Sequence, residues 1–185
     1  TGRAFDPAIG RLLHSRGFYG KSTTTPSGSV TVGMQHIALN LEALEIVREA
    51  DVWIDSGAFG KGEGLDSVRQ FAESEGAEPW LIDLGGQVIV HGQPPGKSSW
   101  TVDIAHPQRR DTAAMKLELK SGSLSTTGNS EQPGHVLDPR TGLPIDFDGS
   151  VIVWHERALV ADIISTALFV MGPEKGIEWA NARGI

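Results

Sequence analysis

Short hydrophobic runs, separated by glycine, proline and aspartate, predict a chain built largely from short strands. In the clearest run, Met115, Leu117 and Leu119 alternate with charged residues, which is typical of an antiparallel strand with one face in water. Residues 37–50 fit an alternating strand and a helical stripe equally well, so their structure stays open. The strands that we expect cover residues 80–84, 88–90, 100–104, 115–119 and 151–154.

Three other segments carry helical patterns. The first follows Gly62 and runs to about Glu75, with Leu65, Val68 and Phe71 on one side. The second, residues 157–171, is hydrophobic on nearly all sides and is expected to be buried on most of its faces. A third and shorter helix, residues 174–183, begins after the proline that ends the second.

Strands and helices together predict an α+β fold, with mixed or antiparallel sheets and packed helices, in a single domain over residues 1–185. The polar segment 22–29 is expected to form a surface loop. A chain of this length buries enough surface to fold without disulfides or a structural metal.

Composition and charge narrow the possible chemistry. The chain has no cysteine, which excludes zinc–thiolate sites, iron–sulfur clusters and thiol nucleophiles. Its net charge is −7 and it carries no basic run, so we expect no nucleic-acid partner. The longest hydrophobic stretch, residues 158–171, is interrupted by polar residues and is too short to cross a bilayer, so we expect no membrane span in this chain.

The second predicted helix carries polar residues among hydrophobic ones. Asp162 and Thr166 are spaced i, i+4, and Ser165 lies at i+3, so the three share one face. A carboxylate in such surroundings needs a partner, because burying an unpaired charge is costly. Two interpretations stay open: Asp162 caps a neighbouring loop, or it binds a hard cation such as Mg²⁺ or Ca²⁺.

A second candidate is the segment His135-Val136-Leu137-Asp138-Pro139-Arg140-Thr141-Gly142. Arg140 can supply forked donors for a phosphate, and the Thr141-Gly142 corner can aim backbone N–H groups at the same anion. The same residues also suit an ordinary turn, with proline fixing φ and glycine in the left-handed region. The sequence leaves both interpretations open.

Two glycine-rich segments could approach a ligand closely. Leu84-Gly85-Gly86-Gln87 lies between two predicted strands and suits either a hairpin bend or a ligand contact. Phe59-Gly60-Lys61-Gly62 leads into the first helix, and a helix N-terminus favours phosphate. The spacing of this second segment matches neither a Walker A loop nor a Rossmann fingerprint.

Taken in order, these segments resemble the FAD:protein FMN transferase family, the flavin transferases formerly described as thiamine-biosynthesis lipoproteins. The most specific similarities are His135 with Asp138 to Gly142, and Ala161-Asp162 with Thr166-Ala167 and Met171-Gly172. The further similar blocks are Phe5-Asp6-Pro7, residues 55–66, Leu84-Gly85-Gly86 and the serine–threonine-rich residues 123–128. This chain departs from the family pattern at Ala58, where a glycine is usual, and at Glu63, where a tyrosine is usual.

The resemblance implies a T-fold-like flavin-transferase architecture, with this chain as the C-terminal portion of the catalytic domain and without the family's N-terminal segment. It also implies that the protein binds FAD and Mg²⁺, cleaves the pyrophosphate, and attaches FMN to a threonine of an acceptor flavoprotein while AMP is released. An extracytoplasmic or periplasmic, membrane-associated location is a further implication.

The same resemblance suggests roles for individual residues. Asp162, Thr166 and the backbone carbonyl of Gly60 would hold the cation. Asp162 is also expected to take part in catalysis, and either His135 or Asp138 would act as general base toward the threonine hydroxyl. The residues expected to bind FAD are Lys61, Gly62, Asp66, Gly85, Gly86, Arg140, Thr141 and Gly142. Two alternatives are a flavin-binding module without turnover and a metal-stabilised structural domain.

Overall fold

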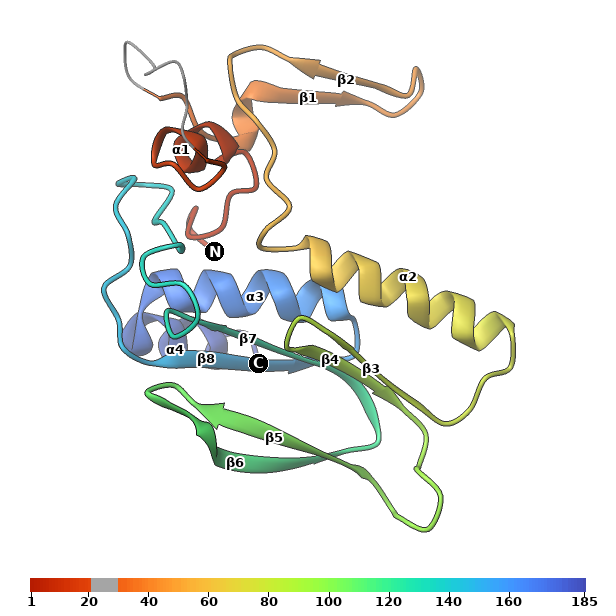
Figure 1. Cartoon of the computed structure of the whole chain (residues 1–185). Helices are drawn as coiled ribbons and strands as arrows, with labels where there is room; N and C mark the ends of the chain where they lie inside the picture. Colours follow the sequence, from red (N-terminus) through yellow and green to blue (C-terminus); the bar gives the residue numbers. More distant parts are fainter. Residues whose placement is uncertain (21–29) are drawn as a thin grey trace.

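A four-stranded antiparallel sheet lies at the centre of the computed structural model (Figure 1), which describes residues 1–20 and 30–185. The expected surface loop at residues 22–29 lies outside these described residues. The strand order is β3-β4-β7-β8, and each neighbouring pair is antiparallel. The strands are β3 (Trp80–Leu84), β4 (Gln87–His91), β7 (Ser121–Gly128) and β8 (Ser150–His155).

Helices cover one face of this sheet and a two-stranded hairpin covers the other (Figure 1). On the helix side, Ile89 of β4 packs against Leu65 and Ala158. On the opposite side, Val88 and Val90 pack against the hairpin. This arrangement follows from the two-residue period of a strand, which sends alternate side chains of β4 to opposite faces. The covering elements are α2 (Gly60–Ser74), α3 (Ala158–Met171), α4 (Pro173–Asn181) and the hairpin of β5 (Trp100–His106) and β6 (Arg109–Leu119).

Strand β7 is the strand of the central sheet that the sequence patterns did not indicate. Its Leu124 joins the core on the hairpin side of the sheet. Ser123, Ser125 and Thr127 alternate with it and are buried beneath the helices. A strand with hydroxyl side chains on its buried face looks polar in sequence. The alternation of hydrophobic and polar side chains that predicts a strand is therefore missing from this serine–threonine-rich segment.

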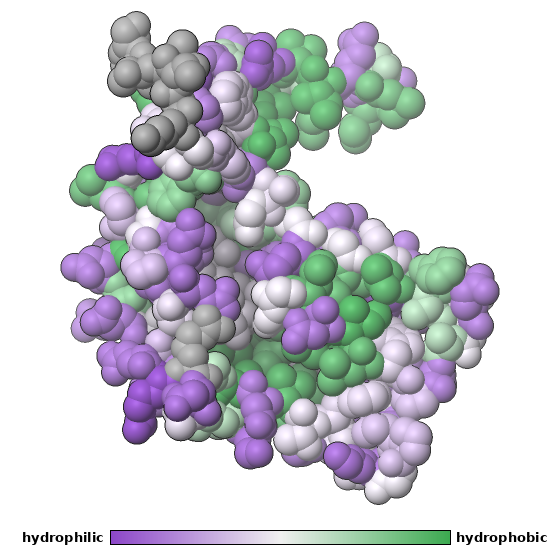
Figure 2. Space-filling model, viewed as in Figure 1, coloured by the Kyte–Doolittle hydropathy of each residue, from purple (hydrophilic) through white to green (hydrophobic). Residues whose placement is uncertain are grey.

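Residues 1–20 and 30–48 form smaller elements that lie above the helix layer in Figure 1. They are α1 (Gly10–Ser15), the short 3₁₀ helix η1 (Met34–His36), and the antiparallel hairpin of β1 (Ile37–Asn40) and β2 (Glu45–Arg48). The ambiguous segment 37–50 is therefore a hairpin. Its hydrophobic side chains are largely exposed, as the green colour of this hairpin in Figure 2 shows.

The expected strands all exist, with small changes in their ends. Residues 80–84 match β3, and residues 115–119 are the second half of a longer strand, β6. Leu117 and Leu119 of β6 pack against the core, as the alternation predicted. Met115 is an exception, because half of its side chain is exposed.

Helix α2 differs from the sequence expectation in two ways. It begins at Gly60 rather than after Gly62, and of its expected hydrophobic face only Leu65 is buried. Val68 and Phe71 are 45% and 66% exposed. The reason is that α2 packs against α3 near its own N-terminus, where Leu65 contacts Ala158, and its C-terminal half is left uncovered.

Helix α3 is buried along most of its length, as its sequence predicted. In the part of the chain that the structure describes, no helix is long and hydrophobic enough to span a membrane.

Candidate functional site

A cavity of about 960 Å³ is lined by residues from both ends of the chain. Its walls come from the segment around α1, the start of α2, the β3–β4 turn, β5, the end of β7 and the face of α3 that carries Asp162 and Thr166. The predicted site residues that line it are Lys61, Gly85, Gly86, His135, Asp162 and Thr166. The fold therefore brings two of the predicted candidates, the polar face of α3 and the histidine before the Asp-Pro-Arg-Thr-Gly turn, to one cavity.

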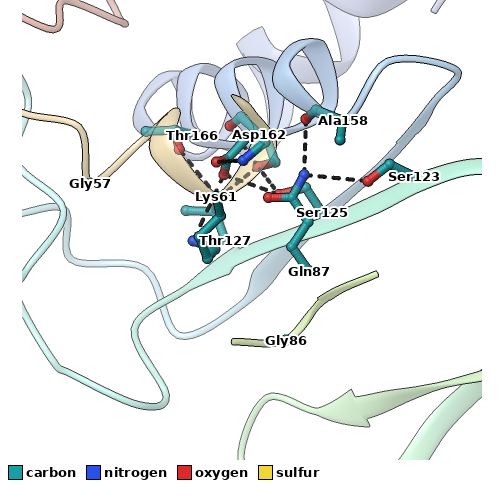
Figure 3. Close-up of polar contacts among 12 residues, drawn as sticks. Gly57, Lys61, Gly86, Gln87, Ser123, Ser125, Thr127, Ala158, Asp162 and Thr166 are labelled. Carbon is teal, nitrogen blue, oxygen red and sulfur yellow. Dashed lines mark hydrogen bonds and ion pairs between the residues drawn. The ribbon is translucent and has the colours of Figure 1, made fainter. Parts of the chain in front are cut away.

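Asp162 is 2% exposed and is held by groups from two other elements (Figure 3). Its Oδ2 accepts a hydrogen bond from the backbone N–H of Gly62 at 3.0 Å. Its Oδ1 lies 3.4 Å from the hydroxyl of Ser125 and 3.9 Å from the Nζ of Lys61. Of the two open interpretations, loop capping is realised in part, through the Gly62 N–H at the start of α2.

A row of hydroxyl groups continues from Asp162 toward the cavity. The Oγ of Ser125 lies 3.1 Å from the Oγ of Ser165, which lies 2.8 Å from the Oγ1 of Thr127. Thr127 in turn lies 3.4 Å from the Oγ1 of Thr166. The row alternates between strand β7 and helix α3, so it exists only because these two elements pack face to face.

The cavity is lined by far more acidic than basic groups. Among the described residues, Lys61 is the one lysine or arginine that lines it. The acidic residues in its walls are Asp6, Asp55, Asp83, Asp103, Glu131 and Asp162. An anionic ligand would meet a negative potential here unless a cation accompanied it.

His135 lines the cavity and has a defined tautomer when it is neutral. Its Nδ1 makes a hydrogen bond to the backbone carbonyl oxygen of Gln132. Because a carbonyl oxygen can only accept, Nδ1 must carry the proton, which leaves the lone pair on Nε2. The imidazole can therefore accept a proton at Nε2.

Asp138, the other candidate base, is paired with Arg140. The guanidinium donates two hydrogen bonds of 2.8 Å to the carboxylate, one to each oxygen. These hydrogen bonds lower the pKa of Asp138 and raise that of Arg140. A carboxylate that is held ionised in this way is a weak proton acceptor.

The residues after Asp138 form a tight turn, which is one of the two interpretations that the sequence left open. The backbone N–H of Gly142 donates to the carbonyl of Asp138 at 2.7 Å, and Gly142 has a φ of +70°. Asp138, Arg140, Thr141 and Gly142 all lie outside the cavity. In this structure the anion held by Arg140 is the carboxylate of Asp138, so the turn does not present the expected free anion site.

Gly62 and Asp66, two expected FAD-binding residues, both have partners within the protein. A Cβ at Gly62 would lie 2.5 Å from the carbonyl oxygen of Ala158, so this glycine allows α2 and α3 to approach closely. Asp66 accepts hydrogen bonds from the N–H groups of Ala158 at 2.9 Å and Leu159 at 3.3 Å. Its carboxylate therefore caps the N-terminus of α3, and both residues lie outside the cavity.

The two glycine-rich segments differ in their relation to the cavity. Gly85 and Gly86 form the β3–β4 hairpin bend, with φ values of +56° and +82°, and they also line the cavity. Gly60 is the first residue of α2, next to Lys61, although it is not itself part of the cavity wall. The exposed Glu63 lies one turn further along α2, outside the cavity.

Several cavity residues were not singled out from the sequence. Thr127 belongs to the unpredicted strand β7, and His106 ends β5. The alternation of hydroxyl side chains at residues 123, 125 and 127 was the one local signal for the strand. Within the described residues, no group of three or more histidine or acidic side chains is arranged to hold a metal ion.

Comparisons with known proteins agree with this geometry. The model of the ApbE family matches residues 1–185. The FAD:protein FMN transferase of Klebsiella pneumoniae is 28% identical over 206 residues, which cover all of this chain and 59% of the relative. The chain thus spans about three-fifths of the length of this relative.

Solved structures show the same fold. The flavinyl transferase ApbE of Pseudomonas stutzeri superimposes with a TM-score of 0.84 and 29% identity, over 98% of this chain and 61% of the other. The ApbE protein of Thermotoga maritima gives a TM-score of 0.82 and 31% identity, over 96% of this chain and 62% of the other. The match of the family model over the whole chain, together with the shared fold, shows that this protein belongs to the ApbE family.

Proposed function

We propose that the protein takes part in FAD:protein FMN transfer: FAD is cleaved at its pyrophosphate, FMN is attached to a threonine of an acceptor flavoprotein, and AMP leaves. The observation that carries the proposal is the shared cavity of Asp162, Thr166, Lys61 and His135 in a chain of this family. Relatives that cover the whole chain bear the name of this activity.

A divalent cation fits the donor groups at Asp162 and Thr166. Both residues line the cavity, and a carboxylate with a hydroxyl is a donor set that Mg²⁺ accepts, with phosphate oxygens and water completing the shell. The acidic walls support the same conclusion, because a pyrophosphate needs a counter-charge that Lys61 alone does not supply. When bound, Mg²⁺ would neutralise charge on the phosphates and on the leaving AMP.

His135 is the better candidate for general base of the two that the sequence left open. Its Nε2 is unprotonated in the tautomer fixed by Gln132, and the ring lines the cavity. Asp138 is ionised, paired with Arg140 and outside the cavity. We therefore assign removal of the threonine proton to His135, and binding of the phosphates to Lys61 together with the backbone of Gly85 and Gly86.

The test is incubation of the chain with FAD, Mg²⁺ and a threonine-bearing acceptor domain. Intact-mass analysis should show one FMN added to the acceptor, and chromatography should show an equal amount of AMP. Asp162→Asn keeps the shape of the side chain and removes its charge, so it should abolish both signals. FAD binding without AMP would favour a binding module, and failure to bind FAD in the presence of Mg²⁺ would favour a structural domain.

A further inference from the structure

The row of hydroxyl groups between Asp162 and Thr166 is largely buried, and its last two members, Thr127 and Thr166, line the cavity. Ser165 is 0% exposed, Ser125 is 1% exposed and Thr127 is 9% exposed. Because buried hydroxyls find their partners within the protein, the direction of each O–H bond is set by the neighbouring oxygens. The directions can therefore be worked out by counting protons.

The count starts at Oδ1 of Asp162, which accepts a hydrogen bond from the hydroxyl of Ser125 at 3.4 Å. Because a hydroxyl has one proton, the contact between Ser125 and Ser165 is a hydrogen bond only if Ser165 donates. The proton of Ser165 goes either to Ser125 or to the backbone carbonyl of Asp162, which lies 3.0 Å from its Oγ. Donation to Thr127 instead would leave both of these contacts without a proton, so the row is best satisfied when Ser165 accepts from Thr127.

The rest of the row follows from this constraint. Thr127 must donate to Ser165 across the 2.8 Å contact, since Ser165 can only accept there. Thr127 then has no second proton to donate, so Thr166 is the donor in the contact between these two hydroxyl groups. The hydroxyl proton of Thr166 consequently points into the protein and its remaining lone pair is directed away from Thr127.

We propose that Ser125, Ser165 and Thr127 are positioning residues that keep the hydroxyl proton of Thr166 directed inward, so that Asp162 and Thr166 both present lone pairs to a divalent cation in the cavity. This inference rests on the proposed cation site. Without the row, the Thr166 hydroxyl is free to turn its proton toward the cavity, where it would repel a cation and compete for the same phosphate oxygens.

Binding of Mn²⁺ alone, followed by electron paramagnetic resonance, tests the proposal without requiring turnover. Thr127→Val removes the acceptor for the Thr166 proton, and Ser165→Ala frees Thr127 to donate to Thr166 instead. Residues that orient metal ligands typically change affinity by about 10- to 100-fold, and we expect both variants to lose affinity in that range. Ser165 does not line the cavity, so its effect cannot come from direct contact with the ion.

Two matched variants separate orientation from general damage. Thr127→Ser retains the hydroxyl and should restore affinity to within about twofold, far less than the loss expected for outer ligand partners. Ser123→Ala removes a hydroxyl on the same buried face of β7 that donates to the carbonyl of Val88 at 2.9 Å, outside the row, and should leave Mn²⁺ affinity unchanged. Thermal unfolding without metal verifies that each variant is folded.

The outcomes distinguish this inference from the proposed function. Unchanged Mn²⁺ affinity in Thr127→Val and Ser165→Ala overturns the positioning role and leaves the cation site intact. Loss in Ser123→Ala as well, or no rescue by Thr127→Ser, also overturns it, because the effect would then be a general packing defect. If the unsubstituted chain binds no Mn²⁺, both the cation site and this inference fail, whereas FMN transfer is judged separately by mass analysis.

Discussion

His135 and Asp138 are three residues apart in sequence, but their hydrogen-bond partners suit them to different chemical roles. The imidazole lines the cavity with Nε2 available, whereas the carboxylate is paired with the guanidinium of Arg140 in the same turn. At the scale of single residues, hydrogen-bond partners thus decide between two side chains that the sequence alone presents as equivalent.

The assignment of His135 predicts a selective loss of turnover. His135→Gln should lower the rate of FMN transfer by about 10²- to 10⁴-fold, the usual contribution of general acid–base catalysis. FAD affinity should change little, because the phosphates are assigned to other residues. Single-turnover transfer and equilibrium FAD titration measure the two effects. The matched variant Asp138→Asn should retain most of the transfer rate, and a larger loss in that variant than in His135→Gln would reverse the assignment.

The Asp138–Arg140 pair predicts a pH-dependent contribution to stability. Because Arg140 lowers the pKa of Asp138 in the folded chain, the pair stabilises the fold above the unfolded pKa of about 4, and this is lost as pH falls through the lower folded value. The arginine side chain is 42% exposed, so the contribution should not exceed about 1 kcal/mol. Urea unfolding of the native chain and Asp138→Asn should differ near neutral pH and converge toward pH ~3. A difference independent of pH would refute the electrostatic origin.

At the scale of elements, the contact between α2 and α3 builds the centre of the site. The N–H of Gly62 donates to Asp162, and Asp66 caps α3 at Ala158. Both contacts join residues more than 90 positions apart in sequence. The same two residues that the family resemblance suggested as FAD contacts therefore hold the helices at the separation that the site requires.

Two glycines of α2 provide a sharp test of this contact. In Gly62→Ala the new Cβ would lie 2.5–2.8 Å from backbone atoms of Ala158 and Leu159, which cannot move away individually. We expect a loss of about 1–3 kcal/mol in the free energy of unfolding, despite the better helix propensity of alanine.

Gly64→Ala is the matched control on the same helix. Its new Cβ would meet only the Cδ2 of Leu84 at 3.5 Å, an ordinary contact. This variant should gain up to about 1 kcal/mol, because the helix propensity of alanine is better and nothing opposes it. Denaturant unfolding of both variants decides the matter, and equal stability of the two would show that α2 and α3 are not in close contact at Gly62.

At the scale of the whole molecule, charge sets the conditions for binding. The chain has a net charge of −7. The cavity wall is also mainly acidic, and among the described residues Lys61 is the one lysine or arginine that lines it. A dinucleotide with a pyrophosphate should therefore enter only together with a cation.

This balance predicts the effect of removing divalent ions. Chelation should weaken FAD binding by about 10-fold or more, since the loss of one favourable charge contact of at least 1.4 kcal/mol corresponds to that factor. Riboflavin, which lacks the phosphates, is the control ligand, and its affinity should not respond to the chelator. Fluorescence titrations with and without Mg²⁺ measure both. FAD affinity that is insensitive to chelation would contradict a cation-assisted site.

The sequence by itself determined the local elements and the grouping of residues within them. Leu65 in α2, the alternation of Leu117 and Leu119 in β6, and the shared face of Asp162 and Thr166 in α3 depend on periodicities of two and 3.6 residues, which are readable in a single segment. The family resemblance also rests on short motifs that follow one another in a fixed order, and the match of the family model confirms it.

Only the tertiary structure decided which of these residues meet. Strand β7 was hidden because Ser123, Ser125 and Thr127 look like loop residues until helices cover them. The contact of Asp66 with the start of a helix 92 residues later in the chain could not be read from the sequence either. The physical reason is that burial, capping and proton direction depend on contacts between distant segments, and no local pattern encodes those contacts.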